Sequence, residues 1–232
     1  RYAEENLGGM ELLSAQERYR LERMARSACK LIRHVEEELA QSRFTPDRFE
    51  LGLGEDREYP PLRVETEDGR TVTVGGTIDR VDVYRSPGGK EYVRVIDYKT
   101  GAKVFRLADV LYGLNMQMLV YLAALVEGGQ EFPAGVLYLP AAEPSASVDR
   151  GADPAKIKKE ADKQMRMSGV VLRDTEIIEA MEAGAKGTFI PASLNKDGTP
   201  SKSSSVLTEG QLKTVLAYAK KLIAAMGQEL SR

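Results

Sequence analysis

Two short acidic runs decide the fold of this chain: Gly76-Thr77-Ile78-Asp79-Arg80-Val81-Asp82 and Val95-Ile96-Asp97-Tyr98-Lys99-Thr100-Gly101. β-Branched and aromatic residues alternate in the manner of a strand through residues 81–84 and 91–96. The turn-forming residues Ser86-Pro87-Gly88-Gly89 separate these two stretches. The sequence therefore predicts an antiparallel hairpin.

The hairpin brings two carboxylates together. Counted outward from the turn, Asp79 and Asp97 lie at nearly equal depth on opposite strands, where cross-strand Cβ atoms are about 4.5–5.5 Å apart. Lys99 follows Asp97 by two residues, so both side chains leave the same face of the strand. Lys99 is thus expected to point at whatever the carboxylates hold.

A divalent cation would relieve the repulsion between the two carboxylates. Hard oxygen ligands with room for water and a phosphate oxygen suit Mg²⁺ or Mn²⁺. Such an ion lowers the pKa of a bound water and stabilises the charge that grows on a phosphorane-like transition state, and an adjacent ammonium adds to this effect. The pattern therefore indicates phosphodiester hydrolysis. Asp82, three residues after Asp79, is expected on the opposite face, and its replacement by Asn is expected to leave metal binding largely intact.

A plain alternative exists for the Asp-x-Lys pattern, because an isolated pair of this kind is most commonly a solvated cross-strand ion pair. The apolar run Val93–Ile96, interrupted only by Arg94, favours the functional interpretation. It predicts a largely buried strand that ends in charge, and carboxylates in such places are usually paired or functional.

Three segments together resemble the signatures of the RecB-like branch of the PD-(D/E)XK nuclease superfamily. They are the two acidic runs and Gln117-Met118-Leu119-Val120-Tyr121, in the same order along the chain. The resemblance implies an α/β fold with a restriction-endonuclease-like core, in which helices flank a mixed central sheet, and a helical C-terminal extension. In the family, the element matched by Gln117 and Tyr121 borders the site and contacts DNA.

The resemblance also implies roles for single residues of the acidic runs. It makes Asp79 and Asp97 the acidic ligands of Mg²⁺ or Mn²⁺, with the backbone carbonyl of Tyr98 as a further ligand. Lys99 matches the catalytic lysine. Catalysis is therefore assigned to Asp79, Asp97 and Lys99.

Further segments resemble the C-terminal nuclease domains of AddB-type subunits of AddAB helicase-nucleases. These segments are Phe49–Gly54, Tyr112–Leu119 and Pro191–Gly198. The resemblance implies a metal-dependent DNA exonuclease domain that acts on a single strand emerging from an unwound duplex. In the intact complex, an AddA-type subunit would be the partner, and the complex would process double-strand breaks for recombinational repair in the bacterial cytoplasm. No Walker motif G-x-x-x-x-G-K-[ST] occurs, so ATP-driven unwinding is not assigned to this chain.

Two features depart from the AddB-type pattern. That family has a His on its first helix as a further metal ligand, whereas the only His, His34, lies in a different segment. The family also has four cysteines that hold a 4Fe-4S cluster, and the one thiolate of Cys29 cannot hold a cluster, so none is expected. These departures predict a domain excised from a longer protein. The alternative is a DNA-binding or scaffolding module that keeps the fold without cleaving DNA.

Further elements are expected on the N-terminal side and in the middle of the chain. Residues 10–42 predict an amphipathic helix with Cys29 buried, His34 partly exposed and Glu36-Glu37-Glu38 on a solvated face. Glu50 opens the first strand and is either an additional metal ligand or a surface residue. Other strands and a long helix are expected at Phe49–Leu53, Leu62–Glu65, Arg70–Val74, Leu107–Val126 and Ala134–Leu139, with all strands in one antiparallel or mixed sheet.

Residues 1–140 are predicted to form the nuclease core and residues 141–232 a helical extension of the same domain. Helices are expected from Asp153-Pro154, over Glu176–Glu182, and from Thr208 to about Gly227. The polar loop Asn195–Ser205 either lines a DNA strand or is an ordinary surface loop. The additional candidates for DNA contact are Arg80, Lys103, Lys196 and Lys202.

Composition bounds the class of protein. With 232 residues, 42% hydrophobic and 29% charged, the chain has ordinary globular usage. The net charge of −2 gives no overall basic signal, so local basic patches must carry any DNA binding. No apolar stretch approaches the roughly 20 residues of a membrane span, so no membrane partner is expected. A single Cys fits a reducing compartment, the cytoplasm.

Overall fold

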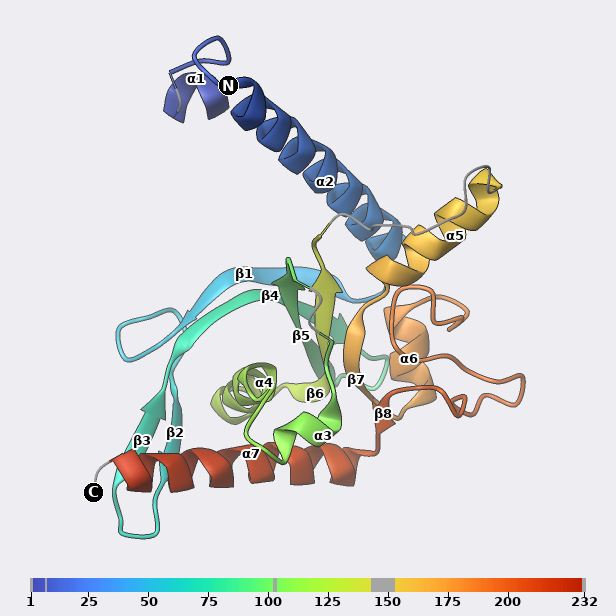
Figure 1. The fold of residues 1–232 in the computed structure, drawn as a ribbon. Helices are drawn as coiled ribbons and strands as arrows, with labels where there is room; N and C mark the ends of the chain where they lie inside the picture. Colours follow the sequence, from blue (N-terminus) through green and yellow to red (C-terminus); the bar gives the residue numbers. More distant parts are fainter. Residues whose placement is uncertain (1, 7, 102–103, 143–152, 231–232) are drawn as a thin grey trace.

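A six-stranded mixed sheet forms the centre of the protein in a computed structural model that describes residues 2–6, 8–101, 104–142 and 153–230 (Figure 1). Its strands follow the order β1-β4-β5-β6-β7-β8. They are β1 (Thr45–Leu53), β4 (Gly76–Arg85), β5 (Glu91–Lys99), β6 (Phe132–Pro140), β7 (Ser168–Leu172) and β8 (Val206–Leu207). The expected α/β fold, a mixed sheet flanked by helices, is confirmed.

Helices lie on both sides of this sheet. They are α1 (Tyr2–Asn6), α2 (Ala15–Leu39), α3 (Leu107–Val110), α4 (Gln117–Gly128), α5 (Pro154–Met165), α6 (Thr175–Met181) and α7 (Glu209–Leu230). Figure 1 shows α4 on the concave side of the curved sheet with α7 crossing beneath it, while α2 projects away from the opposite side. Among the described helices, none combines the length with the apolar character that a membrane span requires.

The predicted hairpin is confirmed as β4 and β5, which pair antiparallel from Arg80↔Ile96 to Arg85↔Glu91. In the turn, the N–H of Gly89 donates to the carbonyl of Ser86 at 3.0 Å. Gly89 has φ 80°, a left-handed conformation that glycine adopts without a steric penalty. The turn residues and the strand alternation are therefore both consistent with the observed register of β4 and β5.

β5 and β6 are parallel, and the segment between them crosses back over the sheet through α3 and α4. α4 is apolar all round because it lies between the sheet and α7, and every residue from Met118 to Leu125 is buried. The expected single helix over 107–126 is wrong. Gly113 and Asn115 take left-handed φ values of 74° and 55°, which end α3 and separate it from α4.

The N-terminal segment forms the expected amphipathic helix, opened by a capping box between Ser14 and Glu17. Part of its apolar stripe is uncovered, since Met24 is 67% and Ile32 66% exposed. The expectation that Cys29 is buried is wrong for the same reason. Only the last turns of α2 pack on the body of the protein. There His34 and Glu38 are buried, contrary to the predictions for them, whereas Glu36 and Glu37 are exposed as predicted.

A separate two-stranded sheet contains β2 (Leu62–Glu65) and β3 (Thr71–Val74). The prediction of the hairpin is confirmed, but the expectation that it joins the main sheet is wrong. β2 instead packs against α4 and α7 and buries Leu62 and Val64 there. A side chain at Gly227 of α7 would place its Cβ 2.2 Å from Val72 Cγ2, so glycine permits this close approach.

The segment after residue 140 is more than a set of helices, because it contributes β7 and β8 to the main sheet. Its predicted helices are present as α5, α6 and α7. Asp153 caps α5 by accepting from the N–H of Ala155 at 2.9 Å, and Thr208 and Gln211 form the capping box of α7. A division of the chain at residue 140 stays a prediction.

Candidate functional site

The β4–β5 ladder ends at the pair Arg80↔Ile96, and the next positions outward are Asp79 and Asp97. At this point the Oδ2 of Asp79 accepts a hydrogen bond from the backbone N–H of Tyr98 at 2.8 Å. A side-chain contact thus takes over where the strand pairing ends. The two carboxylates lie at this fork.

The fork separates two groups of side chains onto opposite faces of the sheet. Asp82 pairs directly with Arg94, so these two share a face. By strand alternation, Asp79, Asp97 and Lys99 lie on the other face. The Nζ of Lys99 forms an ion pair with Oδ2 of Asp97, and their side chains are 20% and 6% exposed. The structure therefore brings the expected acids and lysine to one end of the hairpin.

Tyr138 is a neighbour of this pair that the sequence did not reveal. It lies on β6 beside Asp97 in the parallel register, and Lys99 Nζ is 5.0 Å from the centroid of its ring. Burial and the charge of Asp97 raise the pKa of Tyr138 to about 12. The phenol is therefore protonated, and its ring face supports the ammonium of Lys99.

The donor set fits a small divalent cation. Among the described residues, no group of three or more His, Cys, Asp and Glu side chains is placed to hold a metal. Mg²⁺ is commonly bound through only one or two carboxylates, with waters and substrate phosphates completing its shell. Asp79 and Asp97, with the carbonyl of Tyr98, offer such a set of hard oxygen donors.

Glu50 lies on β1 between the pairs Phe49↔Arg80 and Leu51↔Ile78, and therefore opposite Asp79. Its backbone is left-handed, with φ 50°, and its side chain is exposed. A left-handed conformation is unfavourable for a residue with a Cβ and often accompanies a functional position. Metal binding by Glu50 stays a prediction.

Gln117 and Tyr121 form a pair in the first turns of α4. The Nε2 of Gln117 donates to Oη of Tyr121 at 3.3 Å; Gln117 is exposed, and Tyr121 is 8% exposed. A Cβ at Gly76 would lie 2.4 Å from Oη of Tyr121, so the pair abuts the first residue of β4. It thus borders the strand that carries Asp79.

The other candidates for DNA contact lie elsewhere. Arg80 is 1% exposed and its Nε lies 2.6 Å from Oδ1 of Asp82, so the expectation that it contacts DNA is wrong. Lys103 lies outside the described residues. Lys196 and Lys202 are exposed on a loop that contacts α6 and β7, where Thr175 Oγ1 donates to the Gly198 carbonyl at 3.0 Å.

Comparison with known proteins gives concordant matches. A sequence model described as the PD-(D/E)XK nuclease superfamily matches residues 2–230. A protein from Caldanaerobacter subterraneus, named as a subunit of an ATP-dependent helicase/deoxyribonuclease, is 38% identical over 224 residues, which cover 94% of this chain and 19% of the relative. The protein of the same name from Clostridium novyi is 39% identical over 229 residues, covering 95% of this chain and 20% of the relative. The chain therefore spans about a fifth of the length of the curated relatives it matches.

Proposed function

The chain belongs to the PD-(D/E)XK nuclease superfamily, and on that premise we propose that it is a metal-dependent exonuclease domain that hydrolyses phosphodiester bonds of DNA. The observation that supports this proposal most is the fork at the end of the β4–β5 ladder. It gathers Asp79, Asp97 and Lys99 on one face, and the Gln117–Tyr121 pair borders the start of the strand that carries Asp79.

In this proposal, Asp79, Asp97 and the carbonyl of Tyr98 hold Mg²⁺ or Mn²⁺, with Glu50 as a candidate for a further ligand. When bound, the cation supplies a water of lowered pKa and offsets charge on the scissile phosphate. The ammonium of Lys99 can donate to the attacking water and to a non-bridging phosphate oxygen. The Tyr138 ring limits where that ammonium can lie.

The Gln117–Tyr121 pair would position the nucleic acid. The amide of Gln117, an exposed residue, can donate to a phosphate oxygen, and such contacts fix the register of a strand without reading its sequence. The hydroxyl of Tyr121 accepts a hydrogen bond from that amide and so orients it. Lys196 and Lys202 are proposed as more distant contacts to the same strand.

The relatives carry the name of a helicase/deoxyribonuclease subunit, and we propose the same setting for this chain. Its substrate would be the single strand that leaves an unwound duplex, and its partner an AddA-type helicase-nuclease subunit. The intact assembly would process double-strand breaks for recombinational repair in the bacterial cytoplasm.

Cleavage of an end-labelled single-stranded oligonucleotide tests the proposal. We expect shortening of the oligonucleotide with Mg²⁺, none with a chelator, and none for Asp97→Asn, a variant that keeps the shape of the side chain and removes its charge. DNA binding by the unaltered chain without any cleavage would contradict the proposal and favour the scaffolding alternative.

A further inference from the structure

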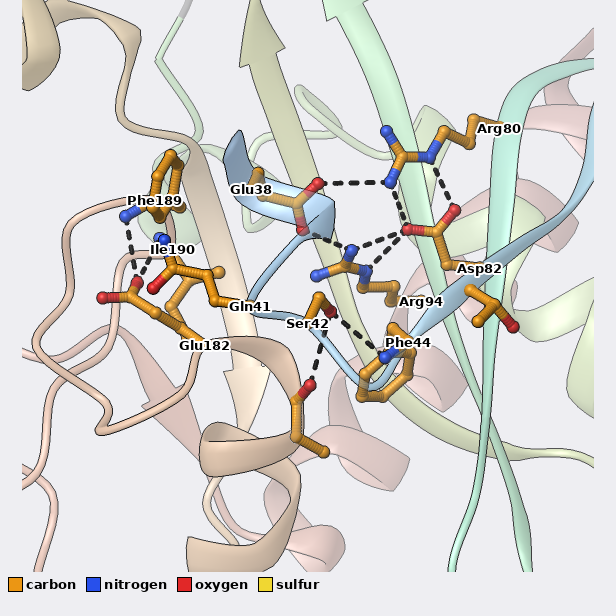
Figure 2. Close-up of polar contacts among 12 residues, drawn as sticks. Glu38, Gln41, Ser42, Phe44, Arg80, Asp82, Arg94, Glu182, Phe189 and Ile190 are labelled. Atoms are coloured by element: carbon orange, nitrogen blue, oxygen red, sulfur yellow. Dashed lines mark hydrogen bonds and ion pairs between the residues drawn. The ribbon is translucent and has the colours of Figure 1, made fainter. Parts of the chain in front are cut away.

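A buried group of four charged side chains lies on the face opposite the candidate site (Figure 2). Glu38 comes from the last turn of α2, Arg80 and Asp82 from β4, and Arg94 from β5. Each of these side chains is at most 1% exposed. Because two are carboxylates and two are guanidinium groups, their formal charges cancel. We call these four residues the buried ion cluster.

Asp82 joins the two arginines within the sheet. Its carboxylate accepts hydrogen bonds from Nε and Nη2 of Arg80, both at 2.6 Å. It also accepts from Nε of Arg94 at 2.9 Å and from Nη2 of Arg94 at 2.7 Å. Burial alone would raise the pKa of Asp82, but the charges of Arg94 and Arg80 and their hydrogen bonds outweigh it and hold the pKa below its usual range. Asp82 is therefore ionised within the cluster.

Glu38 joins the same two arginines from outside the sheet. Its Oε1 accepts from Arg94 Nη2 at 2.6 Å and its Oε2 from Arg80 Nη2 at 3.3 Å. Figure 2 shows its carboxylate joined to both guanidinium groups. One carboxylate on α2 thus bridges β4 to β5.

The buried ion cluster acts where the strand ladder stops. Arg80 belongs to the last backbone pair and directly follows Asp79 in the chain. Its Nη1 also donates to Oη of Tyr98 at 3.5 Å, and the N–H of Tyr98 donates to Asp79. One contact from the cluster, Arg80 to Tyr98, therefore joins β4 to β5 beyond the last backbone pair of the described ladder.

We propose that Glu38 is a positioning residue for the metal site. By bridging Arg80 and Arg94, it sets the spacing of β4 and β5 at the fork, and through that spacing the relative placement of the Asp79 and Asp97 carboxylates. This inference rests on the proposed function, since the two aspartates are the ligands of that site.

Loss of stability alone cannot test this role. Removing one partner of a buried ion pair destabilises a fold whatever else the pair does. A matched control is Glu182, which is also 1% exposed and accepts from the backbone N–H groups of Thr188, Phe189 and Ile190 at 2.8, 2.9 and 3.3 Å. Figure 2 shows the bonds from Phe189 and Ile190. The donors of these contacts follow α6 in the chain, and none of them belongs to β4 or β5.

The experiment measures the dissociation constant of Mn²⁺ by calorimetry, at a temperature at which circular dichroism shows each variant to be folded. For Glu38→Gln we expect affinity to fall by about 10–100-fold, the usual effect of losing a residue that orients metal ligands. For Glu182→Gln we expect a change of less than about twofold, because a reduction in stability without movement of the fork does not alter the ligands.

A double variant covers the case in which Glu38→Gln does not fold. Glu38→Met with Arg94→Met removes one charge of each sign and leaves Arg80 paired with Asp82, and such apolar replacements of buried ion pairs often preserve stability. We expect this variant to fold and to bind Mn²⁺ at least about tenfold more weakly than the unaltered chain does.

Unchanged Mn²⁺ affinity in either folded variant would overturn the inference and leave the proposed function standing. An absence of Mn²⁺ binding by the unaltered chain would overturn the proposed function, and the inference with it. Equal weakening in Glu38→Gln and Glu182→Gln would also overturn the inference, because the effect would then follow from lost stability.

Discussion

Replacing Lys99 with Met separates a catalytic role from a structural one. The Lys99 ammonium pairs with Asp97 and lies 5.0 Å from the centroid of the Tyr138 ring. Met retains an unbranched apolar stem that can pack on the same ring, and it removes the ammonium with its charge and its N–H donors. The change therefore leaves the metal-ligand carboxylates in place while it deletes the cation beside them.

The expected size of the effect depends on the role of the ammonium. If Lys99 only neutralises Asp97, the loss is one of stability. An exposed pair contributes about 0–1 kcal/mol, and breaking a buried pair costs about 3–5 kcal/mol. With side chains 20% and 6% exposed, this pair lies between those limits, so the metal-free variant should lose roughly 1–3 kcal/mol of unfolding free energy. If Lys99 also stabilises the transition state, cleavage should slow by about 10²–10³.

The assay is single-turnover cleavage of an end-labelled single-stranded oligonucleotide at saturating Mg²⁺, with Mn²⁺ affinity measured in parallel. We expect cleavage to slow as stated while Mn²⁺ binds as well or more tightly, because a competing cation has been removed. Lys90→Met is the matched control, since Lys90 Nζ lies 4.9 Å from the Phe132 ring centroid at the turn end of β5, and it should cleave normally. Cleavage by Lys99→Met at the unaltered rate would refute the catalytic role.

Three further predictions follow from single contacts. Asp82→Asn should lower the unfolding free energy in urea by about 3–5 kcal/mol, because it leaves two buried guanidinium groups short of a charge, and unchanged stability would contradict the buried ion cluster. Gly76→Ala should displace Tyr121 and weaken single-stranded DNA binding by about 1 kcal/mol without changing Mn²⁺ affinity, whereas Gly210→Ala, where a Cβ meets nothing within 4 Å, should leave both unchanged; equal DNA affinity in the two variants would show that Tyr121 does not depend on Gly76. Burial lowers the pKa of His34 below its ordinary value of 6.5, so the folded state binds its proton less readily than the unfolded chain does. The stability that this provides is present above pH 6.5 and is lost as the pH falls through the folded pKa, and thermal unfolding of His34→Gln should show a weaker decline over that range; an identical decline would assign the effect to other groups.

Local patterns were sufficient to predict the β4–β5 hairpin and the helix caps, because each depends on neighbours in sequence. The alternation through residues 91–96 and the turn at Ser86–Gly89 fix one register, and that register places Asp79 and Asp97 at the fork. The positions of the candidate site residues could be predicted for the same reason. Their roles in metal binding and catalysis stay predictions.

The buried ion cluster could not be predicted from such patterns. Glu38 sits in a run of three glutamates, which is typical of a solvated helix face, and its burial depends on arginines more than forty residues away. A signal was present in β5, where Arg94 interrupts an apolar run, and in β4, where Arg80 and Asp82 have the spacing of one strand face. Neither signal identifies the helix that completes the cluster.

Two other errors have related causes. Periodicity shows which side of α2 is apolar but not whether another element covers it, so the exposure of Met24 and Cys29 was not predicted. The apolar residues within 107–126 led to the expectation of one continuous helix. The tendency of Gly113 and Asn115 to adopt left-handed backbone conformations was given too little weight, so the break between α3 and α4 was not predicted.

The location of bound Mn²⁺ tests the central claim most directly. Crystals of the chain soaked in Mn²⁺ would reveal the ion by its anomalous scattering. We predict a peak at the fork, with carboxylate oxygens of Asp79 and Asp97 and the carbonyl oxygen of Tyr98 at about 2.0–2.2 Å, and no such peak in Asp97→Asn. A peak that avoids both aspartates, or no peak at all at saturating Mn²⁺, would contradict the assignment of a metal-dependent nuclease site to this fork.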